Sequence, residues 1–591
     1  MNEKSIETIK NRIESKHKGD VKQLEVIFSP HNRLLVEAPA GYGKTHTMVS
    51  RIAYMIATNK IPSPKRLLAL TFSVNAAYKI KKDVSKNIPE LLEGLGLDIQ
   101  IKEKSFVSNY HGFCRSLLKK YGQKLHPTLL NLDILQSIDD SDVASLMRTF
   151  KGLSTEDAEF LSEFNSSVKN IYGKKLSETI ERYNSIIISE ILPKNAIPFN
   201  GILTLTIKLL KDYPNILTFY QNYYTTILVD EFQDTNILSY WLLNILIVEK
   251  TNIIFLGDSL QRIYGFIGAV PNLLNIAQKK FKLNTIELDK NYRFASNQNM
   301  LLLDRIIRQN AVTPFKNPSL LKSDVEFKIY DNQASESLEV VRKSVALIQA
   351  NPDSHVAIIV KQRGPNIDNI IDTFNHNNIP FFYGLFTDDD SNYITFNRKC
   401  LYEFIELIRI QSRITKKLSK LHIDKISELY LADNTPLIKA LFELLKVFWS
   451  RLFSDYSFLS NEDKINFIKD TFEHNGLKQF MEFLDVNIII STVHAAKGLE
   501  WDFVILPDME QDLFPNWFGL CGECKSRSDC NLIIDASKEA KFLEELSVFY
   551  VAVTRAKKQV YFSASKSQLT KFNPKEKNVS CFMKLPGINV I

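Results

Sequence analysis

Eight short apolar runs, each ending in a polar or glycine-containing turn, constrain the fold of this chain most strongly. Such runs are typical of strands that are buried on both faces of a parallel sheet. Segments with helical periodicity, such as "YHGFCRSLLKKYG" and "KFLEELSVFYVAV", lie between them, and this alternation predicts doubly wound α/β layers. The eight runs are "RLLVEAPAG", "RLLALTFS", "TTILVDEFQD", "NIIFLGDS", "HVAIIVKQ", "NIIISTVHAAKG", "WDFVILPD" and "QVYFSAS".

Two long stretches interrupt this alternation, one from about Gly122 to Tyr220 and one from about Leu401 to Phe483. Both are rich in leucine, isoleucine and lysine and contain few strand-like runs, so we expect them to be helical insertions. A chain of 591 residues is too long for a single core. The simplest layout is therefore two α/β domains, each interrupted by one helical subdomain.

Composition narrows the class of protein further. The net charge of +7 is compatible with a polyanionic partner but too small to prove one. Six cysteines in so long a chain argue against a disulfide framework. The N-terminus lacks the apolar core of a secretory signal, and no apolar run approaches the roughly 18 residues of a membrane span. We expect a cytoplasmic protein with no membrane partner.

The segment "EAPAGYGKT", residues 37–45, resembles the phosphate-binding pattern G-x-x-x-x-G-K-[ST], except that Ala38 replaces the first glycine. An apolar strand run leads into Gly41 and Gly43, where backbone N–H groups would wrap phosphates. Lys44 would reach the outer phosphates, and the Thr45 hydroxyl would bind Mg²⁺. The alternative is a glycine-rich loop that contains GKT by chance.

A second motif, "ILVDEFQD", places Asp230 and Glu231 at the end of another apolar run, where a parallel sheet presents its chemistry. Asp230 would hold Mg²⁺ through water, and Glu231 would orient and deprotonate the water that attacks the γ-phosphate. The alternative is a solvated acidic turn. Arg293 and Arg555 are candidates for the cation that such hydrolysis needs, although an isolated arginine is usually a surface charge. The residues alone indicate an NTPase.

Taken together, the segments resemble the UvrD/Rep-type superfamily 1 DNA helicases, in the family's order and across nearly the whole chain. Gln23 lies 21 positions before Lys44, as the adenine-reading glutamine of that family does. The family commonly carries alanine at the position of Ala38. The other segments that carry the resemblance are "TFSVNAA", "YHGF", "VDEFQDT", "LGDSLQRIYGFIGA", "NYRFAS", "TVHAAKGLEWDFVIL" and "YVAVTRAKK".

The resemblance implies ATP and Mg²⁺ as cofactors and assigns roles around the nucleotide. Gln261 would sense the γ-phosphate, Tyr292 would stack on the adenine, and Glu500 would contact the ribose. Arg293 and Arg555 would be arginine fingers from the second α/β domain, acting on a nucleotide held mainly by the first. The implied nucleotide-binding set is Gln23, Ala38, Pro39, Ala40, Gly41, Tyr42, Gly43, Lys44, Thr45, His46, Tyr292, Arg293, Gly498, Glu500 and Arg555.

The resemblance also implies a path for single-stranded DNA. Most of the implied contacts are side chains that stack on bases without reading sequence, although ordinary core aromatics are the alternative. Phe266 and Ile267 stand where the family usually has tryptophan and arginine, so a cationic contact is lost. Ser547 also stands where arginine is common. The implied DNA contacts are Phe72, His111, Tyr264, Phe266 and His494.

By the same resemblance, the fold would be two RecA-like P-loop NTPase domains with parallel sheets, each interrupted by a mainly helical insertion. The first domain would comprise residues 1–121 and 221–285, with its insertion at 122–220. The second would comprise residues 286–400 and 485–591, with its insertion at 401–484. That second insertion is shorter than in full-length housekeeping helicases, and no glycine-rich helix-hairpin-helix signature stands out within it.

A cysteine-rich loop at 521–530, "CGECKSRSDC", is a further candidate site. Cys521, Cys524 and Cys530 have a spacing that occurs in iron-sulfur staples of some helicase-associated nucleases. A closed zinc site needs a fourth ligand, which Cys581, Cys400 or a nearby aspartate would have to supply. The alternative is three free thiols in a surface loop.

These observations predict an ATP-dependent DNA helicase or translocase that moves 3′ to 5′, as its family does, in DNA repair, replication or phage defence. Its partners would be single-stranded DNA, tailed duplex DNA and a nuclease or repair protein. The alternative is a DNA-stimulated ATPase that senses nucleic acid and gates a partner nuclease without robust unwinding. The shortened insertion and the altered "FIGA" segment keep this alternative open.

Overall fold

The computed structural model describes residues 3–95, 101–171, 173–263, 265, 268–312, 320–387, 390–519, 534, 536–569 and 574–591. The chain divides into two compact units. Unit 1 comprises Met1–Pro39, Gly43–Ser259 and Tyr264–Asp289, and unit 2 comprises Ala40–Tyr42, Leu260–Ile263 and Lys290–Ile591.

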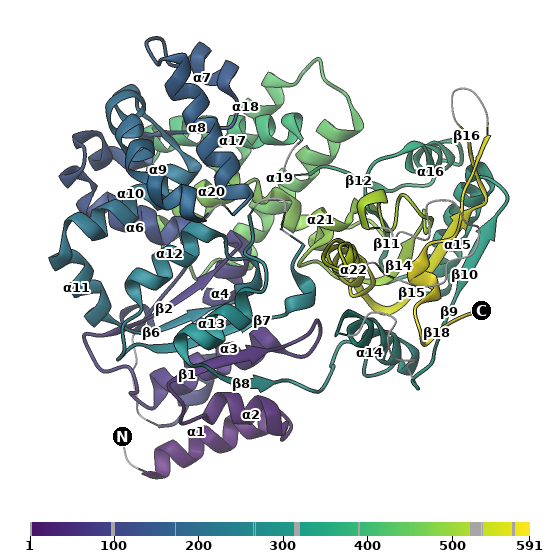
Figure 1. Cartoon of the computed structure of the whole chain (residues 1–591), viewed down its shortest axis with the longest axis horizontal. Helices are drawn as coiled ribbons and strands as arrows, with labels where there is room; N and C mark the ends of the chain where they lie inside the picture. Colours follow the sequence, from purple (N-terminus) through teal and green to yellow (C-terminus); the bar gives the residue numbers. More distant parts are fainter. Residues whose placement is uncertain are drawn as a thin grey trace. The chain divides into compact units, whose positions relative to one another are not determined.

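Unit 1 is built on a six-stranded parallel sheet with the order β3-β2-β6-β7-β1-β8. Several of its strands lie side by side in Figure 1. The central strands are buried along nearly their whole length, which is why their sequences are continuously apolar. The strands are β1 (Arg33–Glu37), β2 (Arg66–Thr71), β3 (Ser105–Asn109), β6 (Tyr224–Val229), β7 (Asn252–Gly257) and β8 (Asn284–Glu287).

Helices cover this sheet, and those between β3 and β6 form a mainly helical region. Its apolar side chains belong to the same core as the sheet, since Leu68 and Phe113 share one buried cluster with Leu161 and Leu205. The helices are α1 (Glu3–Lys16), α2 (Val21–Phe28), α3 (Lys44–Ala57), α4 (Val74–Leu92), α5 (Ile101–Lys104), α6 (Tyr110–Tyr121), α7 (Val143–Thr149), α8 (Thr155–Lys169), α9 (Gly173–Ile186), α10 (Phe199–Asp212), α11 (Pro214–Tyr223), α12 (Ile237–Leu246) and α13 (Leu273–Phe281). A two-stranded sheet joins β4 (Gln136–Ile138) to β5 (Ala196–Pro198).

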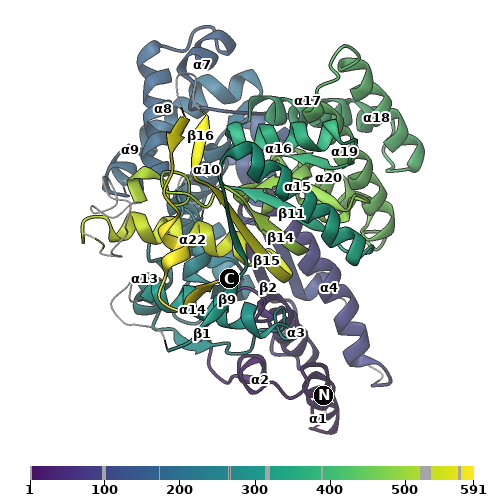
Figure 2. The same ribbon diagram turned by 90° about the vertical axis from the view of Figure 1, so that its right-hand side faces the viewer.

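Unit 2 has a second six-stranded parallel sheet with the order β10-β15-β14-β11-β13-β12. Figure 2 shows β11, β14 and β15 side by side with α15 nearby. The strands are β10 (Phe327–Tyr330), β11 (Val356–Val360), β12 (Phe382–Gly384), β13 (Ile488–Thr492), β14 (Trp501–Leu506) and β15 (Ala556–Ser565). Two small sheets pair β9 (Ser323–Val325) with β18 (Ile588–Val590) and β16 (Ser567–Leu569) with β17 (Pro574–Glu576).

The helices of unit 2 include a second helical region between β12 and β13. Side chains from β11, β13, β14 and the helices beside them form the core of this sheet, with Ile358 and Ile490 fully buried. The helices are α14 (Gln298–Val312), α15 (Gln333–Ala350), α16 (Pro365–His376), α17 (Ser391–Ile410), α18 (Lys416–Leu429), α19 (Pro436–Ser454), α20 (Asn461–Glu473), α21 (Val493–Ala496) and α22 (Glu539–Val553).

The predicted α/β fold with two RecA-like parallel sheets and helical regions is confirmed. All eight apolar runs are strands, and they occupy the four central positions of each sheet. The strands at the sheet edges were not predicted; they are β3, β8, β10 and β12. These strands are short or partly exposed, so they lack the continuous apolar run that marks a central strand.

Candidate active site

The loop between β1 and α3 has the backbone of a phosphate cradle. Gly41 and Gly43 adopt φ of 82° and 78°, a region that glycine enters without steric cost. Helix α3 begins at Lys44 directly after this loop, so its N-terminal N–H groups and its dipole favour an anion there. Ala38 is buried, and its N–H donates to the Gly257 carbonyl at the end of β7. This backbone hydrogen bond ties the start of the loop to the end of β7.

The two carboxylates after β6 converge on this loop within unit 1. The Lys44 Nζ lies 3.8 Å from Asp230 Oδ1 and forms a hydrogen-bonded ion pair with Glu231. Glu231 itself has a positive φ of 52°, which turns the chain sharply after the strand. The structure thus brings together the three residues that the sequence analysis placed at the centre of the chemistry.

Gln233, which the sequence analysis did not single out, holds the Glu231 carboxylate from the other side. Its amide Nε2 donates to Glu231 Oε2 over 2.5 Å, and its Oε1 accepts from the backbone N–H of Asp258 over 3.1 Å. Gln233 is buried. It therefore connects the ends of β6 and β7, and Glu231 is oriented by a cation on one oxygen and an amide on the other.

Burial and neighbouring charges shift the pKa values of this group. Burial lowers the pKa of Lys44, but the Glu231 and Asp230 carboxylates outweigh that effect, and the pKa lies above its usual value. Burial raises the pKa of Asp230 to about 6, against the opposing effect of the Lys44 charge. The ammonium is therefore firmly protonated. Asp230 is a buried acid whose charged form gains from additional positive charge.

Gln23 is fixed beside the first half of α3 by His17, a second residue that was not predicted from the sequence. The His17 Nδ1 lies 2.5 Å from Gln23 Oε1, and its Nε2 lies 2.8 Å from Ser50 Oγ. Burial lowers the pKa of His17, which favours the neutral ring. His46 stacks on His17 with ring centroids 4.2 Å apart. A buried glutamine with a fixed amide plane is suited to reading the edge of a base.

In unit 2, both candidate arginine fingers are held by hydrogen bonds, and each bonds a residue that is next in sequence to a contact or candidate residue of the other. Arg293 donates to the Thr554 carbonyl and forms a hydrogen-bonded ion pair with Glu500. Arg555 is buried and donates to the carbonyls of Val551, at 2.9 Å, and Leu499, at 3.1 Å. Arg293 is thus paired with Glu500, whereas Arg555 is bound by neutral groups next to these two segments of unit 2.

Comparison with known proteins decides the family. Residues 20–282 match the model of the UvrD/REP helicase N-terminal domain, and residues 398–567 match the UvrD-like helicase C-terminal domain. Together the two matches cover more than two-thirds of the chain. The chain belongs to the UvrD/Rep helicase family.

Relatives of this UvrD/Rep family member include proteins named ATP-dependent DNA helicase PcrA. The one from Staphylococcus aureus is 24% identical over 658 residues, which cover 96% of this chain and 86% of the relative. The one from Staphylococcus epidermidis is 24% identical over 653 residues, covering 93% and 83%. The chain is therefore a member of a family of ATP-dependent DNA helicases, which use ATP and Mg²⁺. Among the described residues, no helix is both long and apolar enough to cross a membrane.

The remaining nucleotide candidates of this family member have varied surroundings. Gln261 is buried in a short 3-10 helix, Ser259–Gln261, and Tyr292 is 37% exposed. Gly498 has a φ of 86°, which favours glycine at that turn. Pro39, Ala40 and Tyr42 are buried, whereas Thr45 is half-buried. Their contacts with a nucleotide stay predictions.

Three of the five candidate DNA contacts lie in the described part of this UvrD/Rep chain. Phe72 follows β2 and is half-buried, and His494 lies in α21. His111, in α6, is buried and stacks on Phe199 with ring centroids 3.7 Å apart. Phe199 is 38% exposed, so the pair presents the phenylalanine ring at the surface.

Several other predicted residues fall outside the described part of the chain. These are Tyr264 and Phe266 of the DNA set, Ile267, and the three loop cysteines Cys521, Cys524 and Cys530. Cys400 and Cys581, named as partners for that loop, are buried and not in a disulfide. Burial raises the pKa of the Cys400 thiol well above its usual range. A metal at this loop stays a prediction.

Proposed function

We propose that this protein is a 3′ to 5′ motor on single-stranded DNA that hydrolyses Mg-ATP and separates tailed duplexes. The observation that carries the proposal is the arrangement of Lys44, Asp230 and Glu231 at the carboxyl edge of the unit 1 sheet, beside the start of α3. This edge is where open α/β sheets bind their ligands. The family membership supports the same reading.

The residues of this edge suit Mg-ATP. Thr45 and Asp230 supply the hydroxyl and carboxylate oxygens that Mg²⁺ prefers, and Lys44 suits the outer phosphates. The bound Mg²⁺ would neutralise charge on the transferred phosphoryl group. A polyphosphate competes with Glu231 for the Lys44 ammonium. Glu231, still held by Gln233, would then accept a proton from the attacking water.

The cations of unit 2 would complete the reaction. Arg293 and Arg555 are proposed to stabilise negative charge that develops on the phosphoryl group, and Gln261 to sense that group. To act on phosphate, the Arg293 guanidinium must exchange its contact with Glu500, which is proposed to bind the ribose. Tyr292, partly exposed, would stack on the adenine that Gln23 reads.

For DNA, the proposed contacts are Phe72, His111 and His494 together with Tyr264 and Phe266. In addition, we propose the Phe199 ring, which stacks on His111. The first domain would comprise residues 1–121 and 221–285 around an insertion at 122–220, and the second residues 286–400 and 485–591 around 401–484. The pathway is proposed to be DNA repair, replication or phage defence in the cytoplasm, with a nuclease or repair protein as partner.

A second function is favoured by one feature of unit 2. Between β12 and β13, the described residues form helices α17 to α20 and one short 3-10 helix, a small accessory region. The alternative is a DNA-stimulated ATPase that gates a partner nuclease.

For either function, we also propose that Cys521, Cys524 and Cys530 bind zinc or an iron-sulfur cluster. Metal analysis of purified protein tests this, and a sub-stoichiometric metal content contradicts it.

Two assays on the same preparation distinguish the functions. DNA-stimulated ATP hydrolysis is measured beside strand displacement on matched duplexes that carry either a 3′ or a 5′ tail. The motor predicts stimulated hydrolysis and separation of the 3′-tailed duplex. Stimulated hydrolysis without separation supports the sensor, and preference for the 5′-tailed duplex contradicts the proposed direction.

A further inference from the structure

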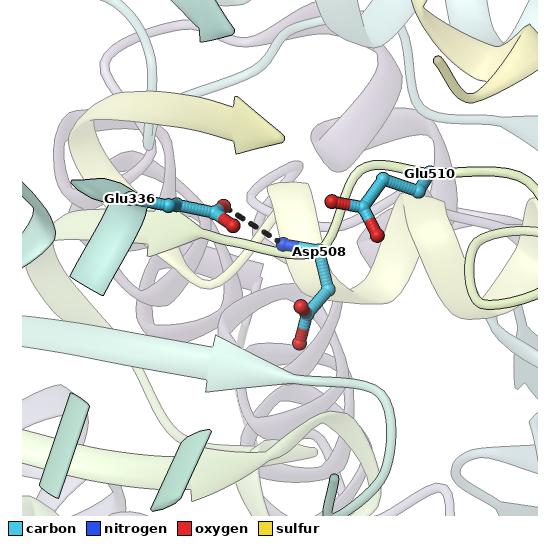
Figure 3. A group of neighbouring side chains, drawn as sticks. All are labelled: Glu336, Asp508 and Glu510. Carbon is cyan, nitrogen blue, oxygen red and sulfur yellow. Dashed lines mark hydrogen bonds between the residues drawn. The ribbon is translucent and has the colours of Figure 1, made fainter. Parts of the chain in front are cut away.

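Three carboxylates that play no part in the proposed ATP chemistry converge at the carboxyl edge of the unit 2 sheet. Glu336 lies in the first turn of α15, while Asp508 and Glu510 lie in the segment that follows β14. One carboxylate oxygen from each of the three lies within 4.8 Å of the others. Figure 3 shows the carboxylates of Glu336 and Glu510 approaching the Asp508 backbone from opposite sides.

Two of the carboxylates are removed from solvent, and all three are bound by neutral donors. Glu336 and Glu510 are fully buried, and Asp508 is half-buried. Glu336 accepts from the Ser563 hydroxyl over 2.6 Å and from the Asn366 amide over 3.0 Å. The same Asn366 amide donates to Asp508 over 2.8 Å.

Glu510 completes the group and leaves one oxygen without a donor. Its Oε1 accepts from the backbone N–H and the hydroxyl of Ser565, over 2.6 and 2.7 Å. Its Oε2 is buried and has no hydrogen-bond partner among the residues that the structure describes. A buried carboxylate oxygen that is left unsatisfied costs free energy comparable to a lost hydrogen bond to a charged group. Glu510 therefore has one buried oxygen without a donor among the described residues, on a carboxylate that points toward Asp508 in Figure 3.

The charge balance of the group is also unfavourable. Burial, and then the Asp508 charge, raise the pKa of Glu336 to about 8. Burial, and then the Glu510 charge, raise the pKa of Asp508 to about 7, although Lys577 acts in the opposite direction. Burial is the largest cause of both shifts, and the neighbouring acids add to it.

We propose that Glu336, Asp508 and Glu510 bind a hard divalent cation, of the class of Mg²⁺, Mn²⁺ or Ca²⁺, at a site separate from the nucleotide. All the ligand atoms are oxygens, which suit these ions and not the nitrogen and sulfur preference of structural zinc sites. The Ser563 and Ser565 hydroxyls act on the same carboxylates and orient them. The cation would tie the start of α15 and the segment after β14 to the end of β15.

The test uses the whole 591-residue chain, freed of metal by a chelator and assayed without nucleotide or DNA. Thermal unfolding and Mn²⁺ electron paramagnetic resonance are measured with Mn²⁺, Mg²⁺ or Ca²⁺ added singly at millimolar concentration. For the wild type we expect a tightly bound Mn²⁺ and a rise in Tm of roughly 2 °C or more with at least one of the ions. Glu510→Gln should lose both signals.

Three further variants keep the outcome decisive. Asp508→Asn, at the half-buried position, should also lose the bound Mn²⁺, and it serves if Glu510→Gln does not fold. Asp502→Asn is the matched control, because its carboxylate on β14 pairs with Lys558 at 3.1 Å outside the cluster. It should keep the wild-type signals. A wild type without a cation-dependent shift, or a shift that survives in both cluster variants, overturns the proposal. Asp230→Asn should leave the shift intact, which separates this site from the proposed ATP site.

Discussion

The carboxyl edges of the two parallel sheets gather acidic side chains in contrasting ways. In unit 1, Asp230 and Glu231 surround the ammonium of Lys44, so the acids carry their own counter-charge. In unit 2, Glu336, Asp508 and Glu510 are bound by serine hydroxyls, an asparagine amide and backbone N–H groups. The carboxyl edges of the two sheets thus place their acids in different electrostatic surroundings. A lysine beside carboxylates suits exchange with a phosphate, whereas acids with neutral donors suit a cation.

The largest effect is expected when the counter-charge of unit 1 is removed. Lys44→Ala should lower DNA-stimulated ATP turnover by about 10³-fold or more, because the residue that neutralises phosphate charge is lost. Steady-state hydrolysis checks this. Binding of single-stranded DNA should remain close to wild type, as measured by fluorescence anisotropy. Lys175→Ala, which removes a surface ion pair with Glu163, is the matched control. Hydrolysis near the wild-type rate in Lys44→Ala would remove the basis for assigning this edge to ATP.

The next effect concerns the cations of unit 2. Arg293→Lys and Arg555→Lys keep the charge but lose the planar fork of donors, so each should lower kcat by about 10²-fold. Single-turnover hydrolysis at saturating ATP measures this loss. Arg409→Lys, an exposed arginine paired with Glu406, should hydrolyse ATP at the wild-type rate. If both finger variants also hydrolyse at that rate, the proposed fingers are misassigned.

The sequence predicted the centres of the sheets better than their edges. A run such as Val356–Val360 is buried at every residue and therefore apolar throughout. The edge strand Asn284–Glu287 buries one of its four residues, which leaves no pattern to recognise. The same distinction applies to the sites. Asp230 and Glu231 follow a strand directly, and Lys44 follows one after a short glycine-containing loop, so their chemistry is visible in short motifs.

Residues whose roles depend on contacts distant in sequence were not predicted. His17 acts through Gln23 and Ser50, and no periodicity marks it. Gln233 was part of a quoted motif, but its contact with the Asp258 backbone exists only after folding. Glu336 lies 172 residues before Asp508, so the acidic cluster had no signature in the sequence.

Removing one charge should change the free energy of unfolding in opposite directions at the two sheet edges. In nucleotide-free, metal-free protein, Lys44→Ala should destabilise unit 1 by roughly 1 to 3 kcal/mol, since it leaves two carboxylates without their cation. Glu510→Gln should stabilise unit 2 by about 1 kcal/mol, since it removes one of three neighbouring acids. Thermal unfolding in chelator checks both signs. A lower Tm in Glu510→Gln would mean that the hydrogen bonds from Ser565 already compensate for the Glu510 charge.

The smallest effect is expected at His17, a residue of unit 1 whose contribution to the site involves no ion pair. His17 is a neutral partner that fixes the plane of the Gln23 amide. His17→Phe keeps an aromatic ring against His46 but removes both ring nitrogens, so the loss is about one hydrogen bond, roughly 1 kcal/mol. KM for ATP should rise by about 3- to 10-fold with kcat nearly unchanged, and discrimination between ATP and GTP should weaken. Ser50→Ala removes only the second contact of the ring and should have a smaller effect. A fall in kcat with unchanged KM would contradict this prediction. It would mean that His17 affects the hydrolysis step at Lys44, Asp230 and Glu231 and not the binding of the base.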